Sequence, residues 1–253
     1  MQLICIILPL LNEEDHIYIL LERIKKSLSN SSFLICIIDD GSTDNTIDEI
    51  KRAETTFALN ITLLERKKTV TGCQRGNALL FGMEWALENT DCNCIIEIDG
   101  DLSHDPAEIK AGLETLRTGN TDVVIGSKYL PQSNITGRKW TRNLISKMSS
   151  KVMRLLFSTE ITDYSNGFRL YTRKAARIIT LYQIRYGSPI YLSEVAAIWL
   201  KNEVNIKEFP SSYHGRMAGY SKFQPIDLLK AGVALLDIAL RYYFFGFRKK
   251  SQE

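Results

Sequence analysis

Residues 94–106 have the sequence CIIEIDGDLSHDP, an apolar run followed by two alternating aspartates. The run predicts a buried β-strand, and Asp99 and Asp101 at its end could bind one divalent cation. Carboxylate oxygens are hard ligands of the kind that Mg²⁺ or Mn²⁺ takes while it also contacts a substrate phosphate. A calcium-binding loop does not fit, because its glycine and glutamate positions hold His104 and Lys110. A turn without metal remains the alternative.

Apolar runs alternate with amphipathic stretches on both sides of this strand. The expected strands are at residues 3–8, 34–38, 61–64, 94–98 and 122–126, and the expected helices at 14–28, 45–54, 74–88 and 106–117. Such alternation predicts an α/β fold with a mostly parallel sheet covered by helices. After Gly126 the pattern changes, and long helices are expected at about 139–157 and 225–245, with short strands near 168–171 and 204–209.

The composition narrows the class of protein further. The chain has 253 residues, enough for a domain over residues 1–224 and an amphipathic C-terminal helix over 225–253. Its net charge of +3 is too small to indicate binding to nucleic acid. Five cysteines without a C-x-x-C pair argue against a zinc site and favour reduced thiols in a cytosolic protein. The N-terminus lacks the features of a signal peptide, and no stretch is apolar enough to predict a membrane-spanning helix.

Two further polar clusters follow expected strands, at residues 12–14 and 39–44. Ligands of open α/β sheets bind outside the carboxyl ends of the strands, so these clusters and the 99–101 aspartates should share one edge. A tight turn and helix cap explain residues 42–44, but they leave the adjacent Asp39 and Asp40 unexplained, because paired carboxylates repel. No glycine-rich phosphate-binding motif is found, so metal-bridged diphosphate binding fits better.

The ordered motifs at residues 9–14, 39–44, 99–106, 126–129 and 166–169 resemble the family 2 glycosyltransferases. The closest similarity is to their dolichol-phosphate mannosyltransferase-like branch. This resemblance implies the GT-A fold, a Rossmann-like nucleotide-sugar domain. It also implies an inverting enzyme that moves a hexose from a nucleotide-diphosphate sugar to a polyprenyl phosphate such as dolichyl or undecaprenyl phosphate. GDP-mannose and UDP-glucose are both open as donors.

The resemblance assigns roles residue by residue. The nucleotide-sugar site would comprise Pro9, Asn12, Glu13, Asp39, Asp40, Asp99, Gly100, Asp101, Arg216 and Lys222. The metal ligands would be Asp99 and Asp101, with Ser103 where the family often has glutamine. The acceptor phosphate would be held by Lys128, Arg142 and Ser146, and catalysis would involve Asp101, Lys128 and Arg142. Asp163 would structure the site.

The nature of the acceptor decides whether a general base is needed. A phosphate acceptor is already ionised near neutral pH, so positioning and charge neutralisation suffice. A glycan hydroxyl would need a carboxylate base, for which Glu194 is the candidate. An ordinary surface glutamate on a helix is the alternative reading of Glu194. A non-catalytic nucleotide-sugar sensor is the rival from another class, and the intact Asp99 and Asp101 argue against it.

Charge and aromatic residues favour a membrane surface as partner. Residues 123–159 contain no acidic side chain and carry the basic residues Lys128, Arg138, Lys139, Arg142, Lys147, Lys151 and Arg154. The last helix is largely apolar and is followed by aromatic and basic residues at 242–250, which suits a membrane interface. We therefore expect peripheral association with the cytoplasmic face of a membrane. Packing on the domain, or contact in a homodimer, explains the apolar face equally well.

Overall fold

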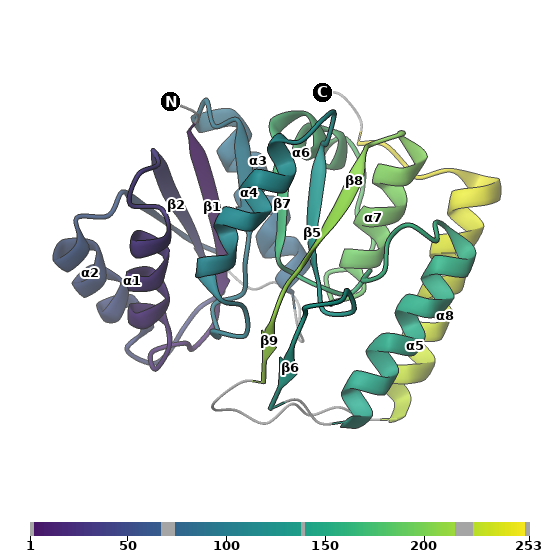
Figure 1. Ribbon diagram of the computed structural model, residues 1–253, viewed down its shortest axis with the longest axis horizontal. Coiled ribbons are helices and arrows are strands. Elements are labelled where there is room, and N and C mark those ends of the chain that lie inside the picture. The colour runs from purple at the N-terminus through teal and green to yellow at the C-terminus, as the bar shows by residue number, and fades with distance from the viewer. Residues whose placement is uncertain (1–2, 67–73, 138–139, 216–224, 251–253) are drawn as a thin grey trace.

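The computed structural model describes residues 3–66, 74–137, 140–215 and 225–250, which form an α/β fold around a seven-stranded sheet (Figure 1). The strand order is β3-β2-β1-β4-β7-β5-β8. The strands are β1 (Ile4–Leu10), β2 (Phe33–Asp39), β3 (Ile61–Glu65), β4 (Cys94–Glu97), β5 (Val123–Ser127), β7 (Arg169–Thr172) and β8 (Ile206–Pro210). Only β7 runs antiparallel to its neighbours, β4 and β5. The prediction of a mostly parallel sheet is confirmed.

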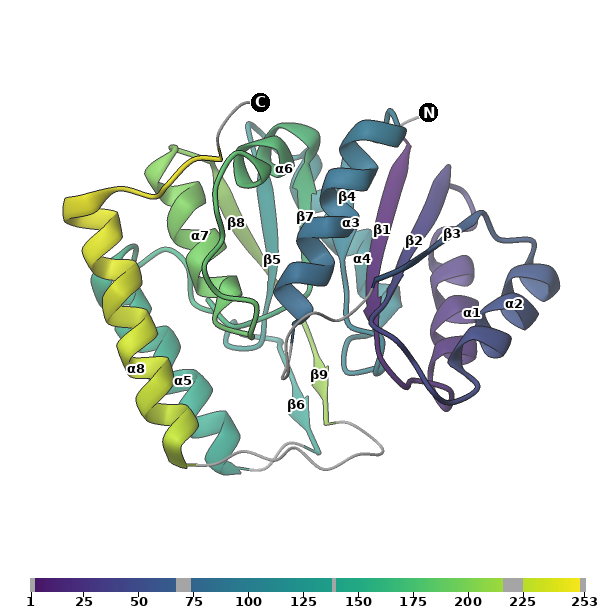
Figure 2. The same cartoon turned by 180° about the vertical axis from the view of Figure 1, so that it is seen from behind.

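Helices cover both faces of the sheet (Figures 1 and 2). One face carries α1 (Ile17–Ser27), α2 (Thr46–Phe57) and α4 (Ile109–Arg117), which follows a short 3-10 turn, Pro106–Glu108. The other face carries α3 (Arg75–Asn89), α6 (Arg173–Thr180) and α7 (Tyr191–Lys201). The strand β1 shows why its sequence is apolar throughout. Cys5 and Ile7 enter one core while Ile6 and Leu8 enter the other, as expected for a strand buried on both faces.

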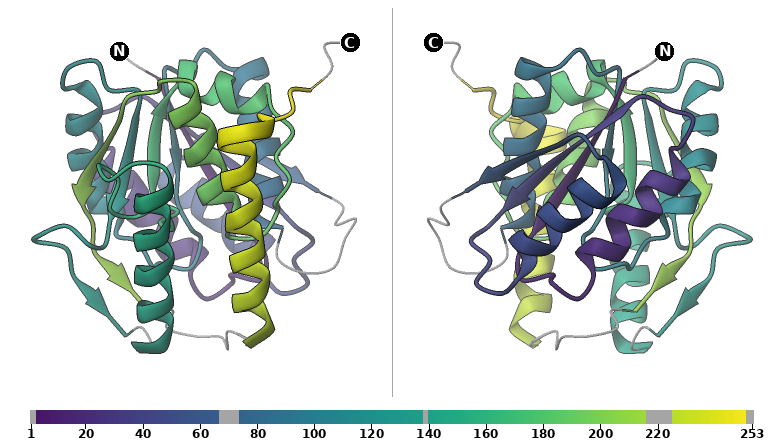
Figure 3. Two further views of the ribbon diagram at one scale, coloured as in Figure 1. Left: turned by 90° about the vertical axis from the view of Figure 1, so that its right-hand side faces the viewer. Right: turned by 90° about the vertical axis from the view of Figure 1, so that its left-hand side faces the viewer.

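Two long helices lie beyond the β8 edge of the sheet, and Figure 3 shows them from that end of the molecule. They are α5 (Trp140–Leu156) and α8 (Pro225–Leu240), and a π-helical turn, η2 (Arg241–Phe245), continues α8. The ring of Phe157, just after α5, packs edge-on against Tyr242 at 4.9 Å between centroids. A small second sheet pairs β6 (Ile135–Thr136) with β9 (Tyr213–His214).

The final helix, α8, buries one face in the core of the domain and exposes apolar side chains on another. Leu235 and Ile238 of α8 belong to the same core as α7, whereas Val233, Leu236 and Leu240 are exposed. One face therefore packs on the domain and the opposite face meets the surroundings. A domain boundary at residue 224 stays a prediction. In the part of the chain that the structure describes, no helix is both long and apolar enough to cross a membrane.

Candidate active site

The loops after β1, β2 and β4 meet at one edge of the sheet, as the sequence predicts. The amide of Asn12 donates to Ser42 Oγ at 2.9 Å, and Asn12 Oδ1 accepts from the amide of Thr43 at 2.8 Å. Gly100 packs against Glu13 and Leu10, where a Cβ would clash with the leucine. Pro9 is the next-to-last residue of β1 and precedes the first of these loops. Those expected nucleotide-binding residues that follow β1, β2 and β4 are therefore brought together, while their contact with a nucleotide stays a prediction.

The adjacent carboxylates Asp39 and Asp40 are satisfied by different partners. Asp39 accepts from the amides of Gly41 and Ser42, each at 3.0 Å, and so fixes the turn after β2. Asp40 accepts two hydrogen bonds from the guanidinium of Arg66, each at 2.8 Å. A bidentate arginine of this kind offsets the repulsion between neighbouring carboxylates. Arg66 was not expected at the site.

Arg75, the first residue of α3, holds the acidic end of β4. Its Nε donates to Asp99, and its Nη1 donates to Glu97 Oε1 at 2.9 Å and to the Tyr191 hydroxyl at 2.6 Å. Its Nη2 donates to the carbonyl of Gly167 at 3.3 Å, where any Cβ would collide with the guanidinium. One side chain thus joins α3, β4, α7 and the loop before β7. Sequence reasoning missed Arg75, although Glu97 inside an apolar strand was a signal that a buried cation must lie nearby.

The environment of Asp99 keeps it ionised. Burial alone would raise the pKa of Asp99, but the charge of Arg75 and the nearby imidazole of His104 hold this pKa well below its ordinary value. His104 Nε2 lies 3.6 Å from Asp99 Oδ2, and the imidazole is buried between Phe168 and Tyr213. These contacts favour the ionised form of Asp99.

The donor set at the end of β4 fits a divalent cation. Asp101 Oδ1 accepts from the amide of Ser103 at 3.1 Å. The hydroxyl of Ser103 is buried, and within the described residues it has no hydrogen-bond partner. Two carboxylates and this hydroxyl are hard oxygen ligands. No third His, Cys, Asp or Glu joins them among the residues that the structure describes, so substrate phosphate or water would complete a coordination shell.

Lys128 is buried against Asp163. Its Nζ lies 2.6 Å from Asp163 Oδ2, and the exposed fractions of the two side chains are 3% and 0%. Burial would raise the pKa of Asp163, but Lys128 and Ser165 hold it below its ordinary value. The ammonium group of Lys128 is thus engaged inside the protein, and its expected contact with an acceptor phosphate stays a prediction. Asp163 matches its expected role in structuring the site.

Beside this pair, a chain of hydroxyl groups surrounds Ser146. The Tyr129 hydroxyl donates to Ser146 Oγ at 2.8 Å, and Ser146 Oγ lies 2.7 Å from Ser165 Oγ. Arg142 is on α5 one turn before Ser146, but its side chain is outside the described residues. Arg216 and Lys222 also lie outside them. The acceptor side of the site is thus described through Ser146 and its hydroxyl partners.

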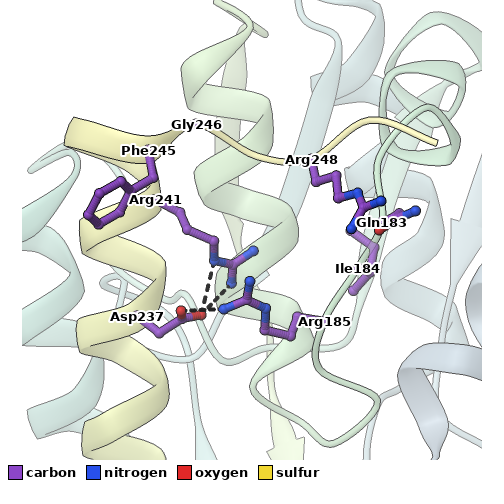
Figure 4. A pocket seen from close by; sticks show the side chains of 8 residues that line it. All are labelled: Gln183, Ile184, Arg185, Asp237, Arg241, Phe245, Gly246 and Arg248. Carbon is purple, nitrogen blue, oxygen red and sulfur yellow. Dashed lines mark hydrogen bonds and ion pairs between the residues drawn. The ribbon is translucent and has the colours of Figure 1, made fainter. Parts of the chain in front are cut away.

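Glu194 is neither an exposed glutamate nor a free base. It is fully buried, and its carboxylate accepts from the amides of Arg185 and Tyr186 at 3.0 Å and from Arg241 Nη1 at 2.6 Å. Arg241 in turn pairs with Asp237, as Figure 4 shows. The burial of Glu194 contradicts the reading of an ordinary surface glutamate. Both of its oxygens accept hydrogen bonds, and its role as a general base stays a prediction. Its ion pair with Arg241 links α7 to η2.

Comparisons with known proteins agree with this architecture. The model of the glycosyl transferase family 2 matches residues 5–179. A polyprenol monophosphomannose synthase of Mycolicibacterium smegmatis is 26% identical over 241 residues, which cover 93% of this chain and 86% of the relative. An undecaprenyl-phosphate mannosyltransferase of Micrococcus luteus is 30% identical over 219 residues, or 85% of each chain.

A solved structure has the same fold. Glucosyl-3-phosphoglycerate synthase from Mycobacterium tuberculosis, in complex with Mn²⁺, UDP and glucosyl-3-phosphoglycerate, superposes with a TM-score of 0.64. The match covers 94% of this chain and 80% of that one at 17% identity. The matched family model and the relatives establish that this chain belongs to glycosyl transferase family 2, in the branch that resembles dolichol-phosphate mannosyltransferases.

Proposed function

We propose that the protein is an inverting, metal-dependent transferase that moves a hexose from a nucleotide-diphosphate sugar to a polyprenyl phosphate. The observation that supports this proposal is the placement of Asp99 and Asp101 just after β4, next to a buried Ser103 hydroxyl that has no hydrogen-bond partner among the described residues. The names of the two relatives support a polyprenyl phosphate as acceptor and mannose as the sugar. GDP-mannose is therefore the first donor to test, with UDP-glucose second.

On the donor side, the chain supplies carboxylates and a structured loop. Asp39 and Asp40 lie in the loop after β2 that would bind the nucleoside, and Arg66 fixes Asp40 in place. A divalent cation held by Asp99 and Asp101, with Ser103 directly or through water, would neutralise the negative charge that builds on the leaving diphosphate. Arg216 and Lys222 are proposed to assist at the same phosphates. Arg75 donates to Asp99 and favours its ionised form.

On the acceptor side, the chain needs to position an existing nucleophile. An ionised lipid phosphate attacks the anomeric carbon from the face opposite the leaving diphosphate, and no proton has to be removed first. Ser146 and Tyr129 would turn their hydroxyl protons, donated to Ser165 and Ser146 in this structure, toward such a phosphate, and Arg142 offers charge. Lys128 acts indirectly, by holding Asp163 and through it Ser165 beside Ser146. A hydroxyl acceptor is less well supported, because Glu194 is occupied.

The setting of the site suits a lipid acceptor. The α5 residues Trp140, Leu144, Met148, Val152 and Leu155 are exposed large apolar side chains. They recur at three- and four-residue spacing, so they lie along one face of the helix that carries Ser146. Such a face is typical of a helix at a membrane interface. We propose peripheral association with the cytoplasmic face of a membrane, with a homodimer contact as the alternative use of this face.

Asp101→Asn tests the proposal directly. The substitution removes one carboxylate charge without a large change in volume, so we expect metal-dependent transfer to fall by at least about a hundredfold while nucleotide binding is partly kept. Asp105→Asn is the matched control, because Asp105 caps the 3-10 turn a few residues away and has no proposed contact with metal. If Asp101→Asn transferred sugar at the wild-type rate, or if EDTA had no effect on transfer, the metal-dependent mechanism would be wrong.

A further inference from the structure

A cavity lies away from the proposed active site, between the segment before α7 and the end of α8 (Figure 4). It has a volume of about 480 Å³. The side chains that define it are Gln183, Arg185, Asp237, Arg241, Phe245 and Arg248. None of these residues takes part in the site at the end of β4.

Arginine dominates the cavity. At its base, Arg241 is 8% exposed and lies between Asp237 and the buried Glu194. Nearer the surface, the side chain of Arg185 is 59% exposed and shares Asp237 with Arg241. Arg248 faces the cavity and has no carboxylate partner in the described part of the chain. Three guanidinium groups thus face two carboxylates, which leaves an excess of positive charge at the mouth.

The frame of the cavity is fixed by the backbone. The amide of Gln183 donates to the carbonyl of Arg248 at 2.8 Å, and the amide of Lys250 donates to the carbonyl of Leu181 at 2.8 Å. Tyr182 and Lys249 form an antiparallel bridge between the same two segments. The two walls that carry Arg185 and Arg248 are therefore tied together. A site with its charges held in place loses less entropy when it binds an anion.

The mouth of the cavity borders the exposed apolar face of α8. Asp237 and Arg241 each come one residue after an exposed leucine, Leu236 or Leu240. One residue is a rotation of about 100° around a helix, so the polar pair lies on the flank of the apolar face. Phe245 lines the cavity and is 77% exposed. An aromatic side chain beside arginines is the arrangement found where a protein meets both acyl chains and headgroups.

We propose that this cavity binds the phosphate headgroup of an anionic membrane phospholipid, distinct from the polyprenyl phosphate that accepts the sugar. A guanidinium group offsets the charge of a phosphate and can donate two parallel hydrogen bonds to its oxygens. The neighbouring phenylalanine and the leucines of α8 provide the contact with acyl chains. The inference rests on the proposed membrane association and adds a specific headgroup contact to it. The cavity would hold α8 at the bilayer while the site at the end of β4 works on a different lipid.

Vesicle co-sedimentation tests the headgroup site. The full chain is compared on vesicles of phosphatidylcholine and of phosphatidylcholine mixed with phosphatidylglycerol. We expect tighter binding to the mixed vesicles, and a loss of roughly fivefold in this binding for each charge removed in Arg185→Gln/Arg248→Gln. The matched control is Lys147→Gln/Lys151→Gln, which removes the same charge from exposed positions of α5. Equal losses in both double variants would mean diffuse attraction by basic residues and would overturn the proposal.

Short-chain soluble phosphatidylglycerol supplies a second measurement without vesicles. Calorimetry should detect saturable binding to the wild-type protein and none to Arg185→Gln/Arg248→Gln. If inorganic phosphate binds equally well and vesicle composition has no effect, the cavity takes a free anion and the lipid assignment is wrong. Thermal unfolding of the variant is recorded alongside, and an unchanged transition shows that the loss is not one of folding.

Sugar transfer in detergent separates this inference from the proposed function. We expect Arg185→Gln/Arg248→Gln to match the wild-type rate when acceptor and enzyme are both in micelles, because the cavity contacts bulk lipid and not substrate. If the wild-type protein transfers no sugar, the proposed function fails while the vesicle result still stands or falls by itself. A variant that loses transfer in micelles would place the cavity in the acceptor site and contradict the separate headgroup site.

Discussion

The ammonium group of Lys128 lies 2.6 Å from Asp163 Oδ2, in a pair that is almost completely withdrawn from solvent. The same carboxylate accepts from the Lys128 amide, and its other oxygen accepts from Ser165. Since Ser165 also contacts Ser146, the pair reaches the proposed acceptor position through two hydroxyl groups. We therefore propose that Lys128 is a positioning residue, whose contribution to activity should follow its contribution to structure.

Replacement of Lys128 by methionine should cost about 3–5 kcal/mol in the free energy of unfolding, because it leaves Asp163 buried without a counter-charge. Lys128→Met/Asp163→Leu, which removes both charges, should recover much of this loss. Urea unfolding of the two variants and the wild type measures the difference. A single variant with wild-type stability but without sugar transfer would show that Lys128 contacts the phosphate itself.

The stability of the protein should depend on pH through Asp163. Its pKa in the folded state is below its ordinary value of 3.8, so the carboxylate stabilises the fold at pH above that value. This contribution is lost as the pH falls through the folded pKa. The difference in unfolding free energy between wild type and Asp163→Asn should thus shrink from about pH 6 to about pH 3, by at most about 1 kcal/mol. Asp91→Asn, at an exposed position, is the control, and a constant difference for Asp163→Asn would refute the assignment.

Arg75 should compete with a metal ion for Asp99. Arg75→Gln removes a positive charge bound to that carboxylate, so Mn²⁺ should bind roughly tenfold more tightly in the absence of nucleotide. Isothermal titration calorimetry measures this directly. Arg66→Gln is the matched control, because it removes the same charge from Asp40 and should leave Mn²⁺ affinity within about twofold. Weaker Mn²⁺ binding by Arg75→Gln would mean that the arginine orients Asp99 as a ligand and does not compete.

Ser146→Ala should weaken binding of the acceptor and leave binding of the donor nearly unchanged. Loss of one hydrogen bond to a phosphate corresponds to a rise of roughly tenfold in the KM for polyprenyl phosphate, with little change in the KM for nucleotide sugar. Ser150→Ala, one turn further along α5, is the control, since Ser150 is also buried and its hydroxyl has no partner among the described residues. Equal effects of the two substitutions would indicate a general disturbance of α5.

Local patterns were sufficient to predict the frame of this site. The apolar runs before Asp39 and Asp99 identified β2 and β4, and the rule that parallel strands end at one edge brought their loops together. The position of β7 could not be predicted, because a four-residue strand carries too little pattern to show that it enters the sheet between β4 and β5. Its antiparallel direction follows from tertiary packing.

The sequence did not predict which charged side chains pair with one another. Arg75 and Glu97 are 22 residues apart, and Glu194 and Arg241 are 47 apart, so no local spacing marks either pair. Buried carboxylates in apolar or helical stretches still gave a usable signal, because an ionised group without solvent needs a counter-charge. That signal predicts a cation but does not say which one.

The central claim is sugar transfer to a lipid phosphate, and extraction of the product into organic solvent tests it most directly. Purified protein is incubated with a short polyprenyl phosphate, Mg²⁺ or Mn²⁺ and labelled GDP-mannose or UDP-glucose, with EDTA as the control. We predict metal-dependent label in the organic phase, with GDP-mannose the better donor. If every donor supplied were bound but none gave an extractable product, the claim would be contradicted. The protein would then be a glycan transferase or a nucleotide-sugar sensor.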